Sequence, residues 1–208
     1  MNILIGDDHS VVRKGLRLIL ADAFPDAFIE EASDGNQIIE KLFLKDWNII
    51  ISDISMPGKS GIEITKKAKE LLPKVPVLIL SVHAPEQYAV RLLKAGAAGY
   101  LTKESAPEEL VNAVNQILGG RKYITPEIAD LLIDYKGDAT ETKKHEILSD
   151  REFEVLKLIA SGKTVSEIAE ILSLSINTIS TYRARILEKM SMNTNAELTK
   201  YAVTYGLV

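Results

Sequence analysis

Five polar side chains suited to phosphoryl transfer stand at, or directly after, the ends of short apolar runs: Asp7, Asp8, Asp53, Ser81 and Lys103. A carboxylate at the end of a buried strand is costly unless a cation compensates it. Three carboxylates at one place favour Mg²⁺, which binds through one or two carboxylates and keeps several waters. A lysine and a hydroxyl suit phosphoryl oxygens. Together these groups are the parts that phosphoryl transfer to an aspartate nucleophile requires.

The run that ends at Asp53 has the pattern of a central strand. Residues 48–52 are nearly all apolar and include three consecutive isoleucines, which indicates a strand buried on both faces of a parallel sheet. The segment Met56-Pro57-Gly58 follows and cannot continue a strand. Further strands are predicted at residues 3–5, 28–29, 75–80 and 99–101, and helices at about 12–23, 35–45, 60–72, 85–95 and 106–118.

Strands that alternate with helices over residues 1–120 predict an α/β fold, with one parallel sheet covered on both faces. In such sheets, ligands bind outside the carboxyl ends of the strands, where the strand order reverses. The five polar side chains follow four different strands, so we expect the fold, rather than closeness in sequence, to bring them together.

The alternation stops after Gly120, and the rest of the chain is helical in pattern. Pro126 opens a helix that is expected to run to about Tyr135. Residues 136–146 lack apolar periodicity and indicate a linker. Helices are then predicted at 150–161, 165–172, 176–191 and 195–205. Capping boxes are expected at three of their starts, formed by Ser149 with Glu152, Thr164 with Glu167, and Thr194 with Glu197.

Composition excludes several classes of protein. The chain has 208 residues and no cysteine, so a disulfide framework and thiolate chemistry are excluded. Neither an apolar run of about 18 residues nor a secretory leader is visible, so we expect no membrane span and a cytoplasmic location. The net charge is −4, and residues 146–208 carry 7 Lys or Arg against 8 Asp or Glu. A broadly basic surface for nucleic acid is therefore not expected.

Residues 1–120 resemble the response-regulator receiver domain of two-component signalling. The resemblance rests on Asp7-Asp8, on Asp53 before Met56-Pro57-Gly58, on Leu80-Ser81 and on the stretch Gly99-Tyr100-Leu101-Thr102-Lys103. It implies a flavodoxin-like, five-stranded, doubly wound parallel fold. It also implies that Asp53 is the phosphoacceptor. Mg²⁺ would be bound by Asp8, Asp53 and the backbone carbonyl of Ser55, with Asp7 acting through water.

The same resemblance implies roles for three further residues. Ser81 and Lys103 would hold the phosphoryl oxygens, and Tyr100 would be an aromatic switch that turns inward when Ser81 moves to the phosphate. Taken alone, Tyr100 is equally consistent with a packing residue. His83, two residues after Ser81, either tunes hydrolysis or has no role there. His9 and His145 show no partner in the pattern and are expected to be structural or solvated.

Helix 165–172, the turn Ser173-Leu174-Ser175 and helix 176–191 have the spacing of a helix-turn-helix. The second helix has a polar face of Asn, Ser, Thr and Arg, which suits base edges and phosphates. The plain alternative is an ordinary surface helix.

Residues 148–208 resemble the LuxR-type (NarL/FixJ-type) DNA-binding domain, which has four helices. The matching residues are Leu148-Ser149-Asp150-Arg151-Glu152, Glu154-Val155-Leu156, Ile159-Ala160-Ser161-Gly162, Glu167-Ile168-Ala169, Leu172, Thr178-Ile179, Glu188-Lys189-Met190 and Gly206-Leu207. The resemblance implies that helix 176–191 enters the major groove, with bases facing Ser180, Thr181 and Ala184. Phosphate contacts are expected from Asn177, Thr178, Arg183, Arg185 and Lys189. The last helix would form either a dimer seam or core packing with Leu198, Tyr201, Ala202 and Tyr205.

Together the resemblances imply a bacterial transcription regulator and not an enzyme. A sensor histidine kinase would phosphorylate Asp53 and so control the binding of a homodimer to promoter DNA, with RNA polymerase as a further candidate partner. Two alternatives stay open: a DNA-binding protein that is independent of phosphorylation, and a Mg²⁺-dependent phosphohydrolase. The intact pair of Ser81 and Lys103 argues against the first, and the short loops argue against the second. With so little positive charge, useful affinity is expected only from a dimer on two half-sites about one helical turn apart.

Overall fold

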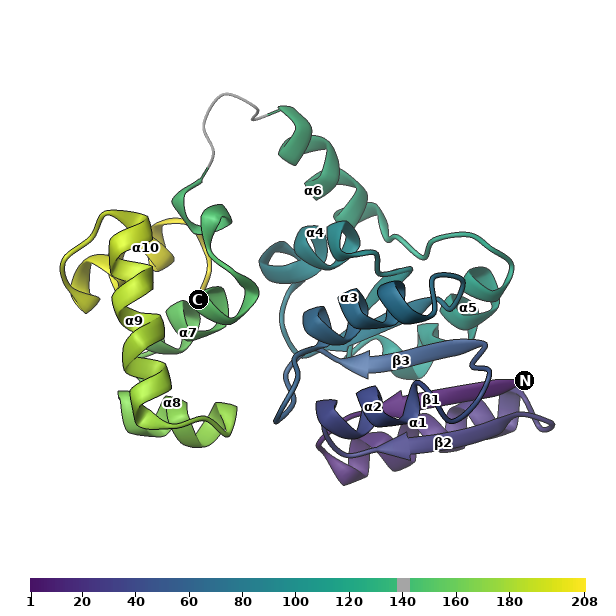
Figure 1. Ribbon diagram of the computed structural model, residues 1–208. Coiled ribbons are helices and arrows are strands. Elements are labelled where there is room, and N and C mark those ends of the chain that lie inside the picture. Colours follow the sequence, from purple (N-terminus) through teal and green to yellow (C-terminus); the bar gives the residue numbers. More distant parts are fainter. Residues whose placement is uncertain (138–142) are drawn as a thin grey trace. The chain divides into compact units, whose positions relative to one another are not determined.

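The computed structural model describes residues 1–137 and 143–208, which divide into two compact units, Met1–Ile133 and Asp134–Val208. Figure 1 shows the α/β unit and the helical unit. Residues 138–142, the middle of the expected linker, lie outside the described residues. No helix or strand was predicted at the end of this linker, whereas Lys144–Ile147 forms a short 3₁₀ helix, η1.

The α/β unit contains one five-stranded parallel sheet in the order β2-β1-β3-β4-β5. The strands are β1 (Asn2–Gly6), β2 (Phe28–Ala32), β3 (Ile49–Asp53), β4 (Val77–Ser81) and β5 (Gly99–Thr102). This is the doubly wound order that was predicted, and it reverses between β1 and β3. Every residue of β3 and β4 is buried, as their apolar runs predict.

Five helices alternate with these strands: α1 (Ser10–Ala23), α2 (Gly35–Lys41), α3 (Gly61–Leu71), α4 (Pro85–Ala95) and α5 (Ala106–Leu118). One face of the sheet packs against α1 and α5, where Leu16, Leu20, Leu110 and Val114 join the isoleucines of β1 and β3 in the core. Because the other helices pack beside one another on the second face, the sheet is covered on both sides (Figure 1).

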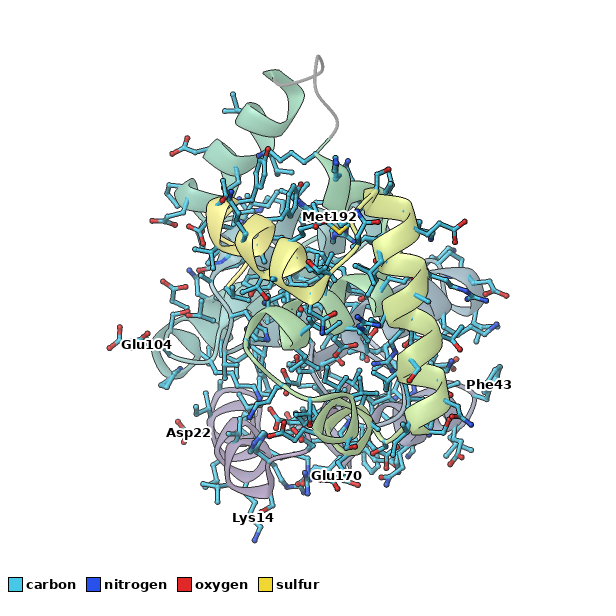
Figure 2. All side chains as sticks on the ribbon, turned by 90° about the vertical axis from the view of Figure 1, so that its left-hand side faces the viewer. Lys14, Asp22, Phe43, Glu104, Glu170 and Met192 are labelled. Atoms are coloured by element: carbon cyan, nitrogen blue, oxygen red, sulfur yellow. The ribbon has the colours of Figure 1, made fainter. Side chains whose placement is uncertain are left out.

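The predicted extent of the second helix was wrong. That helix ends at Lys41 and not at Lys45, because the Trp47 indole Nε1 donates a hydrogen bond to the Lys41 carbonyl at 2.9 Å and ends the turn there. The chain then turns and leaves the next two side chains largely exposed, Phe43 (68%) and Leu44 (65%). Figure 2 shows Phe43 projecting outward.

The segment after α5 extends the sheet edge. Tyr123 forms an isolated parallel bridge with Gly99 of β5, and its hydroxyl donates to Glu109 Oε2 at 2.9 Å. Helix α6 (Pro126–Gly137) begins at the expected proline, and its Ile128 is buried. The first unit therefore continues beyond the end of α5.

The helical unit contains α7 (Asp150–Ala160), α8 (Val165–Leu172), α9 (Ile176–Met190) and α10 (Asn195–Thr204), each within one residue of its predicted range. Capping boxes form at Ser149 and Thr164, as predicted. At Thr194 only half of the box forms, because the Glu197 carboxylate accepts from the backbone N–H of Asn193 and not from that of Thr194.

Candidate functional site

The carboxyl edge of the sheet gathers the predicted acidic residues. Asp7 and Asp8 follow β1, and Asp53 ends the neighbouring strand β3, so the switch point between these strands holds all three. One ligand atom from each of Asp7, Asp8, His9 and Asp53 lies within 4.8 Å of the others. Asp7 and Asp53 are buried, at 0% and 3% exposure. Their oxygens are hard ligands of the kind that Mg²⁺ takes, so the donor set fits a divalent cation.

Lys103 supplies the positive charge in this cluster. Its Nζ lies 2.8 Å from Asp53 Oδ2 and 2.7 Å from Asp7 Oδ2. Asp7 Oδ2 is buried and has no hydrogen bond of good geometry among the described residues, so the ion pair is its compensation. Burial opposes the charged form of Lys103, but its hydrogen bond to Asp53 and the negative charges of Asp53 and Asp7 outweigh burial and raise its pKa.

The environment of Asp53 disfavours its ionised form. Burial raises the pKa of its carboxyl, and the hydrogen bond and charge of Lys103 oppose that shift without cancelling it. The negative charge of Asp7 adds to the rise, and the backbone N–H of Ser55, 3.4 Å from Asp53 Oδ1, lowers the pKa slightly. An incoming cation would therefore be favoured at this carboxylate. The predicted role of the Ser55 carbonyl stays a prediction.

Ser81 ends the next strand, one residue beyond the residue that pairs with Asp53. Its Oγ is buried and accepts a hydrogen bond from the backbone N–H of His83 at 2.9 Å, and its carbonyl accepts from the N–H of Lys103 at 2.7 Å. The ends of β4 and β5 are thereby tied together beside Asp53. His83 Nε2 lies 3.5 Å from the Ser55 hydroxyl, at the limit of a hydrogen bond.

Tyr100 already points into the protein. It is 1% exposed, and its hydroxyl donates to the carbonyl of His83 at 2.7 Å. Burial raises the pKa of Tyr100 to about 12. The resemblance to receiver domains implies an inward ring when Ser81 moves to the phosphate, whereas here the core and the His83 carbonyl hold the ring inward without a phosphate. A switch through Tyr100 stays a prediction.

The turn after Asp53 is shaped by glycine. Gly58 has a positive φ of 80°, which favours glycine. A Cβ on Gly61 would lie 2.8 Å from both the Asp53 carbonyl oxygen and the Ile54 Cα, so α3 can start against the backbone of the site only with glycine there. Ser60 caps that helix in a full capping box with Glu63. The two glycines therefore let the chain turn after β3 and begin α3 close to the backbone of Asp53.

His9 was missed as a member of the site. It was expected to lack a partner, whereas its Nδ1 lies 2.7 Å from Asp8 Oδ1 and 3.5 Å from Asp7 Oδ1. The signal that could have found it is its position directly after two aspartates at the end of a strand, where the chain must turn to begin α1.

The surface of α9 carries the predicted base-facing residues. Ser180, Thr181 and Ala184 are exposed, and Ile179, Ile186 and Met190 on the opposite side are buried. Asn177 and Arg185 are exposed beside them. The helix therefore presents the predicted polar face, and the turn before it is closed by Ser173, which has a left-handed φ of 53°.

Three predicted phosphate-contacting residues are already engaged within the unit. Lys189 Nζ lies 2.7 Å from Oε2 of Glu152, which is only 2% exposed. Arg183 Nε donates to Asn195 Oδ1 at 2.6 Å, and the hydroxyl oxygens of Thr178 and Ser175 are hydrogen-bonded at 2.8 Å. The sequence had no signal for the first of these contacts, because its partners are 37 residues apart.

The four residues predicted as a dimer seam or as core packing on α10 differ in their burial. Leu198 and Ala202 are fully buried, so core packing is what the structure shows for them. Tyr201 and Tyr205 lie beside each other, with ring centroids 4.4 Å apart, and Tyr205 is 47% exposed. His145 was expected to be structural or solvated, and the structure places its Nδ1 3.0 Å from the Tyr201 hydroxyl.

A parallel sheet with carboxylates, a hydroxyl and a lysine at its switch point, joined to a helix-turn-helix, defines the class of response regulators. The family description "Response regulator receiver domain" matches residues 3–115, and "Bacterial regulatory proteins, luxR family" matches residues 146–202. The chain therefore belongs to the NarL/FixJ family of response regulators. That family consists of regulators and not of enzymes, so the phosphohydrolase alternative has no support.

Similar proteins agree over the whole chain. Response regulator UvrY of Escherichia coli (strain K12) is 35% identical over 209 residues, which cover 100% of this chain and 95% of the relative. Response regulator GacA of Pseudomonas protegens is 35% identical over 208 residues, with 100% and 98% covered. Among solved structures, RcsB from Salmonella enterica serovar Typhimurium, bound to promoter rprA with the phosphomimetic BeF₃⁻, gives a TM-score of 0.65 at 29% identity, with 97% of each chain covered. None of the helices in the described ranges is long and apolar enough to cross a membrane.

Proposed function

We propose that phosphorylation of Asp53 by a sensor histidine kinase controls the binding of this protein to promoter DNA. The observation that carries the proposal is the juxtaposition of Asp53 with Lys103 at 2.8 Å, inside a group of carboxylates within 4.8 Å of one another. A buried carboxylate held beside a cation and a metal-binding donor set is the arrangement needed for a phosphoryl acceptor.

In this proposal, Asp53 attacks the phosphorus of the kinase phosphohistidine, and the phosphorus–nitrogen bond breaks as the new phosphorus–oxygen bond forms. Lys103 leaves its ion pair with Asp53 and binds a phosphoryl oxygen, while Ser81 donates its hydroxyl to another. Because Ser81 and Lys103 are joined by a backbone hydrogen bond of 2.7 Å, their movements are coupled. The change then passes along β4 and β5, where Tyr100 is the proposed switch.

Mg²⁺ is the proposed cofactor, held by Asp8, Asp53 and the Ser55 carbonyl, with Asp7 acting through water. When bound, it supplies positive charge to the carboxylates and to the phosphoryl oxygens. The buried, negatively charged donor set supports this assignment, because Lys103 is shared between Asp7 and Asp53 and compensates them only in part.

The proposed output is the exposed polar face of α9. Ser180, Thr181 and Ala184 would face the bases, and Asn177 and Arg185 the phosphates. We keep Thr178, Arg183 and Lys189 as weaker candidates, because each already has a partner within the unit. A homodimer is proposed on DNA, in line with a similar RcsB structure described as two dimers bound to two parallel DNAs, with a TM-score of 0.61 at 29% identity.

The proposed domain limits are 1–120 for the receiver, 121–145 for the helix and linker, and 146–208 for the DNA-binding domain. The family matches at 3–115 and 146–202 support the two outer ranges. RNA polymerase is a proposed further partner. A cytoplasmic location is proposed because a bacterial promoter-binding regulator acts on the chromosome.

The test is phosphorylation of the full chain by a small-molecule phosphoryl donor with Mg²⁺, followed on a Phos-tag gel. Wild type should shift and Asp53→Asn should not, while Asp22→Asn, at an exposed aspartate on α1, should shift like wild type. Size measurement before and after phosphorylation then reports dimer formation. A wild-type protein that takes no phosphate but binds promoter DNA would favour the alternative that is independent of phosphorylation.

A further inference from the structure

Arg13, in the first turn of α1, reaches back to the turn that carries the acidic residues. Side chains on a helix lean toward its N-terminus, so a long residue at this position covers the segment that precedes the helix. Its Nη1 donates to the backbone carbonyl of Asp7 at 2.6 Å, and its Nε donates to Glu31 Oε2 at 3.0 Å. The side chain is only 15% exposed, so these contacts are largely shielded from water. One guanidinium thus joins α1, β2 and the turn after β1.

The hydrogen bond to Asp7 fixes a peptide unit of the site itself. The Asp7 carbonyl belongs to the planar peptide that joins Asp7 to Asp8, so holding its oxygen sets the direction in which the chain leaves Asp7. The backbone N–H of Asp7 donates to the Ala32 carbonyl of β2 at 3.2 Å. Asp7 is therefore held by both of its backbone groups, and Arg13 provides the second of these contacts.

Glu31 orients the guanidinium in turn. Its Oε2 pairs with Arg13, and its Oε1 lies 3.6 Å from Nη1 of Arg17. The donors of a guanidinium form a rigid, planar fork that can hold two acceptors in a set geometry, whereas a lysine ammonium is a flexible point charge. Arg13 is therefore fixed to a strand of the sheet, and the turn that it contacts is fixed with it.

We propose that Arg13 is a positioning residue of the acidic cluster, because it holds the Asp7–Asp8 peptide so that both carboxylates face Asp53 and can take a divalent cation together. Groups that orient the ligands of a metal typically change its affinity 10–100-fold when they are replaced. This inference rests on the proposed function only in that the acidic cluster binds Mg²⁺.

The sign of the effect separates positioning from simple electrostatics. Arg13 carries a positive charge beside the cluster, so by charge alone its removal should strengthen the binding of a cation. A positioning role predicts the opposite, a weaker affinity for the cation. A purely structural role predicts lower stability with an unchanged affinity.

The matched variants are Arg13→Met and Arg17→Met. Arg17 shares Glu31 but donates its second contact to the Ile29 carbonyl of β2, at 2.7 Å. Titration of the unphosphorylated full chain with MgCl₂, followed by nuclear magnetic resonance, should give an affinity about tenfold weaker for Arg13→Met. Arg17→Met should stay within about twofold of wild type. Arg13→Lys keeps the charge and one donor, so its affinity should fall between those of wild type and Arg13→Met.

A second readout needs no metal. In the metal-free protein, the backbone N–H groups of Asp7 and His9 should exchange with solvent about fivefold faster in Arg13→Met, relative to the amides of β3. That factor corresponds to the loss of one hydrogen bond. Circular dichroism checks that each variant is folded. If Arg13→Met does not fold, the comparison of Arg13→Lys with Arg17→Lys replaces it, with the loss again expected only at Arg13.

The other outcomes overturn the inference. An Mg²⁺ affinity that is unchanged or stronger in Arg13→Met excludes positioning, and an equal loss in Arg17→Met shows that the pairing with Glu31 stabilises α1 in general. Exchange that rises in β3 as much as in the turn shows a structural role. If wild type itself binds no Mg²⁺, the proposed cofactor fails and the positioning role fails with it. Binding by wild type with no change in Arg13→Met removes only the role of Arg13.

Discussion

Asp53 illustrates the conflict between stability and signalling at a single residue. Its carboxyl is 3% exposed, and burial raises its pKa despite the ion pair with Lys103. A raised pKa in the folded state means that the ionised form is disfavoured by folding, so stability is lost as the pH rises from the ordinary aspartate range through the folded pKa. At neutral pH the protein therefore bears the cost of a charge that its proposed function needs.

We predict that Asp53→Asn stabilises the protein at pH 7 without divalent cations, because the amide keeps the shape and removes the charge. The expected gain is about 1 kcal/mol, the scale of one imperfectly compensated buried polar group. The gain should shrink as the pH falls through the pKa of Asp53, since the protonated carboxyl is then also neutral. Thermal unfolding of the two proteins between pH 4 and pH 7 measures this difference.

The matched control is Asp22→Asn, a carboxylate on α1 that projects outward in Figure 2. It should change stability by less than about 0.5 kcal/mol at every pH. Mg²⁺ should then stabilise wild type more than Asp53→Asn, because a ligand bound only by the folded state adds to stability. A gain for Asp53→Asn that is the same at pH 4 and pH 7 would contradict the electrostatic origin.

At the scale of elements, an ion pair between the buried Glu152 and the exposed Lys189 joins the start of α7 to the end of α9. Burial opposes the ionised form of Glu152, but its hydrogen bonds to Lys189 and Ser149 outweigh burial and lower its pKa. A depressed pKa contributes stability above the unfolded value of about 4.5, and that contribution is lost as the pH falls through the folded pKa. The pair links α9 to α7, so we expect its loss to affect DNA binding only through the position of α9.

We predict that Lys189→Met costs more stability than Glu152→Gln, about 2 kcal/mol against about 1, because it leaves a buried carboxylate without its cation. The double variant should lose less than the sum of the two. Urea unfolding at pH 7 measures all three. Additive losses would show that the two side chains do not stabilise the unit as a pair.

DNA binding distinguishes Lys189 from a residue that contacts phosphate. Replacement of a phosphate-contacting residue reduces the slope of log K against log salt by about one. We predict that reduction for Arg185→Met, because Arg185 is exposed on α9, and an unchanged slope for Lys189→Met. Fluorescence anisotropy over a salt series measures the slopes of both variants. A reduced slope for Lys189→Met would show that Lys189 contacts phosphate.

The end of α9 offers a simpler prediction. Ser191 has a φ of 53°, in the left-handed region that costs a non-glycine residue about 1 kcal/mol. Ser191→Gly should therefore raise stability by up to about 1 kcal/mol, as thermal unfolding would report. Ser161→Gly, at the end of α7 with a φ of −78°, is the control and should give no gain. Equal effects of the two changes would refute the conformational explanation.

The sequence predicts elements better than it predicts contacts. Apolar runs and turn residues placed all five strands and the helices of the second unit, because these signals are local. The end of α2 escaped prediction since it depends on the Trp47 indole, six residues beyond Lys41. The predicted capping box at Thr194 formed only in half, because the Glu197 carboxylate accepts a hydrogen bond from the N–H of Asn193 instead. His9 and the Glu152–Lys189 pair depend on how the chain turns and packs, which no spacing rule contains.

At the scale of the whole molecule, we predict that weak charge makes DNA binding depend on the association of two chains. Residues 146–208 carry one more acidic than basic residue, and Lys189 is paired with Glu152. Because phosphate contacts supply much of the affinity for DNA, a single domain should bind weakly. A second linked domain adds an effective concentration that can raise affinity by about 10²–10⁴ without a new contact. In the proposed function, phosphorylation would then control binding by controlling dimers.

This dependence predicts a periodic response to the spacing of half-sites. Two domains on one face of the duplex should bind best when half-site centres lie about one helical turn apart, roughly 10 base pairs. Five inserted base pairs turn one half-site to the opposite face and should weaken binding of the phosphorylated full chain about 100-fold, and ten should restore part of it. Gel-shift titration measures the series, with Asp53→Asn as the control that shows weak, spacing-independent binding. Equal affinity of the phosphorylated protein at every spacing would mean that each domain binds alone, and that the signal from Asp53 must reach α9 by a route other than dimerisation.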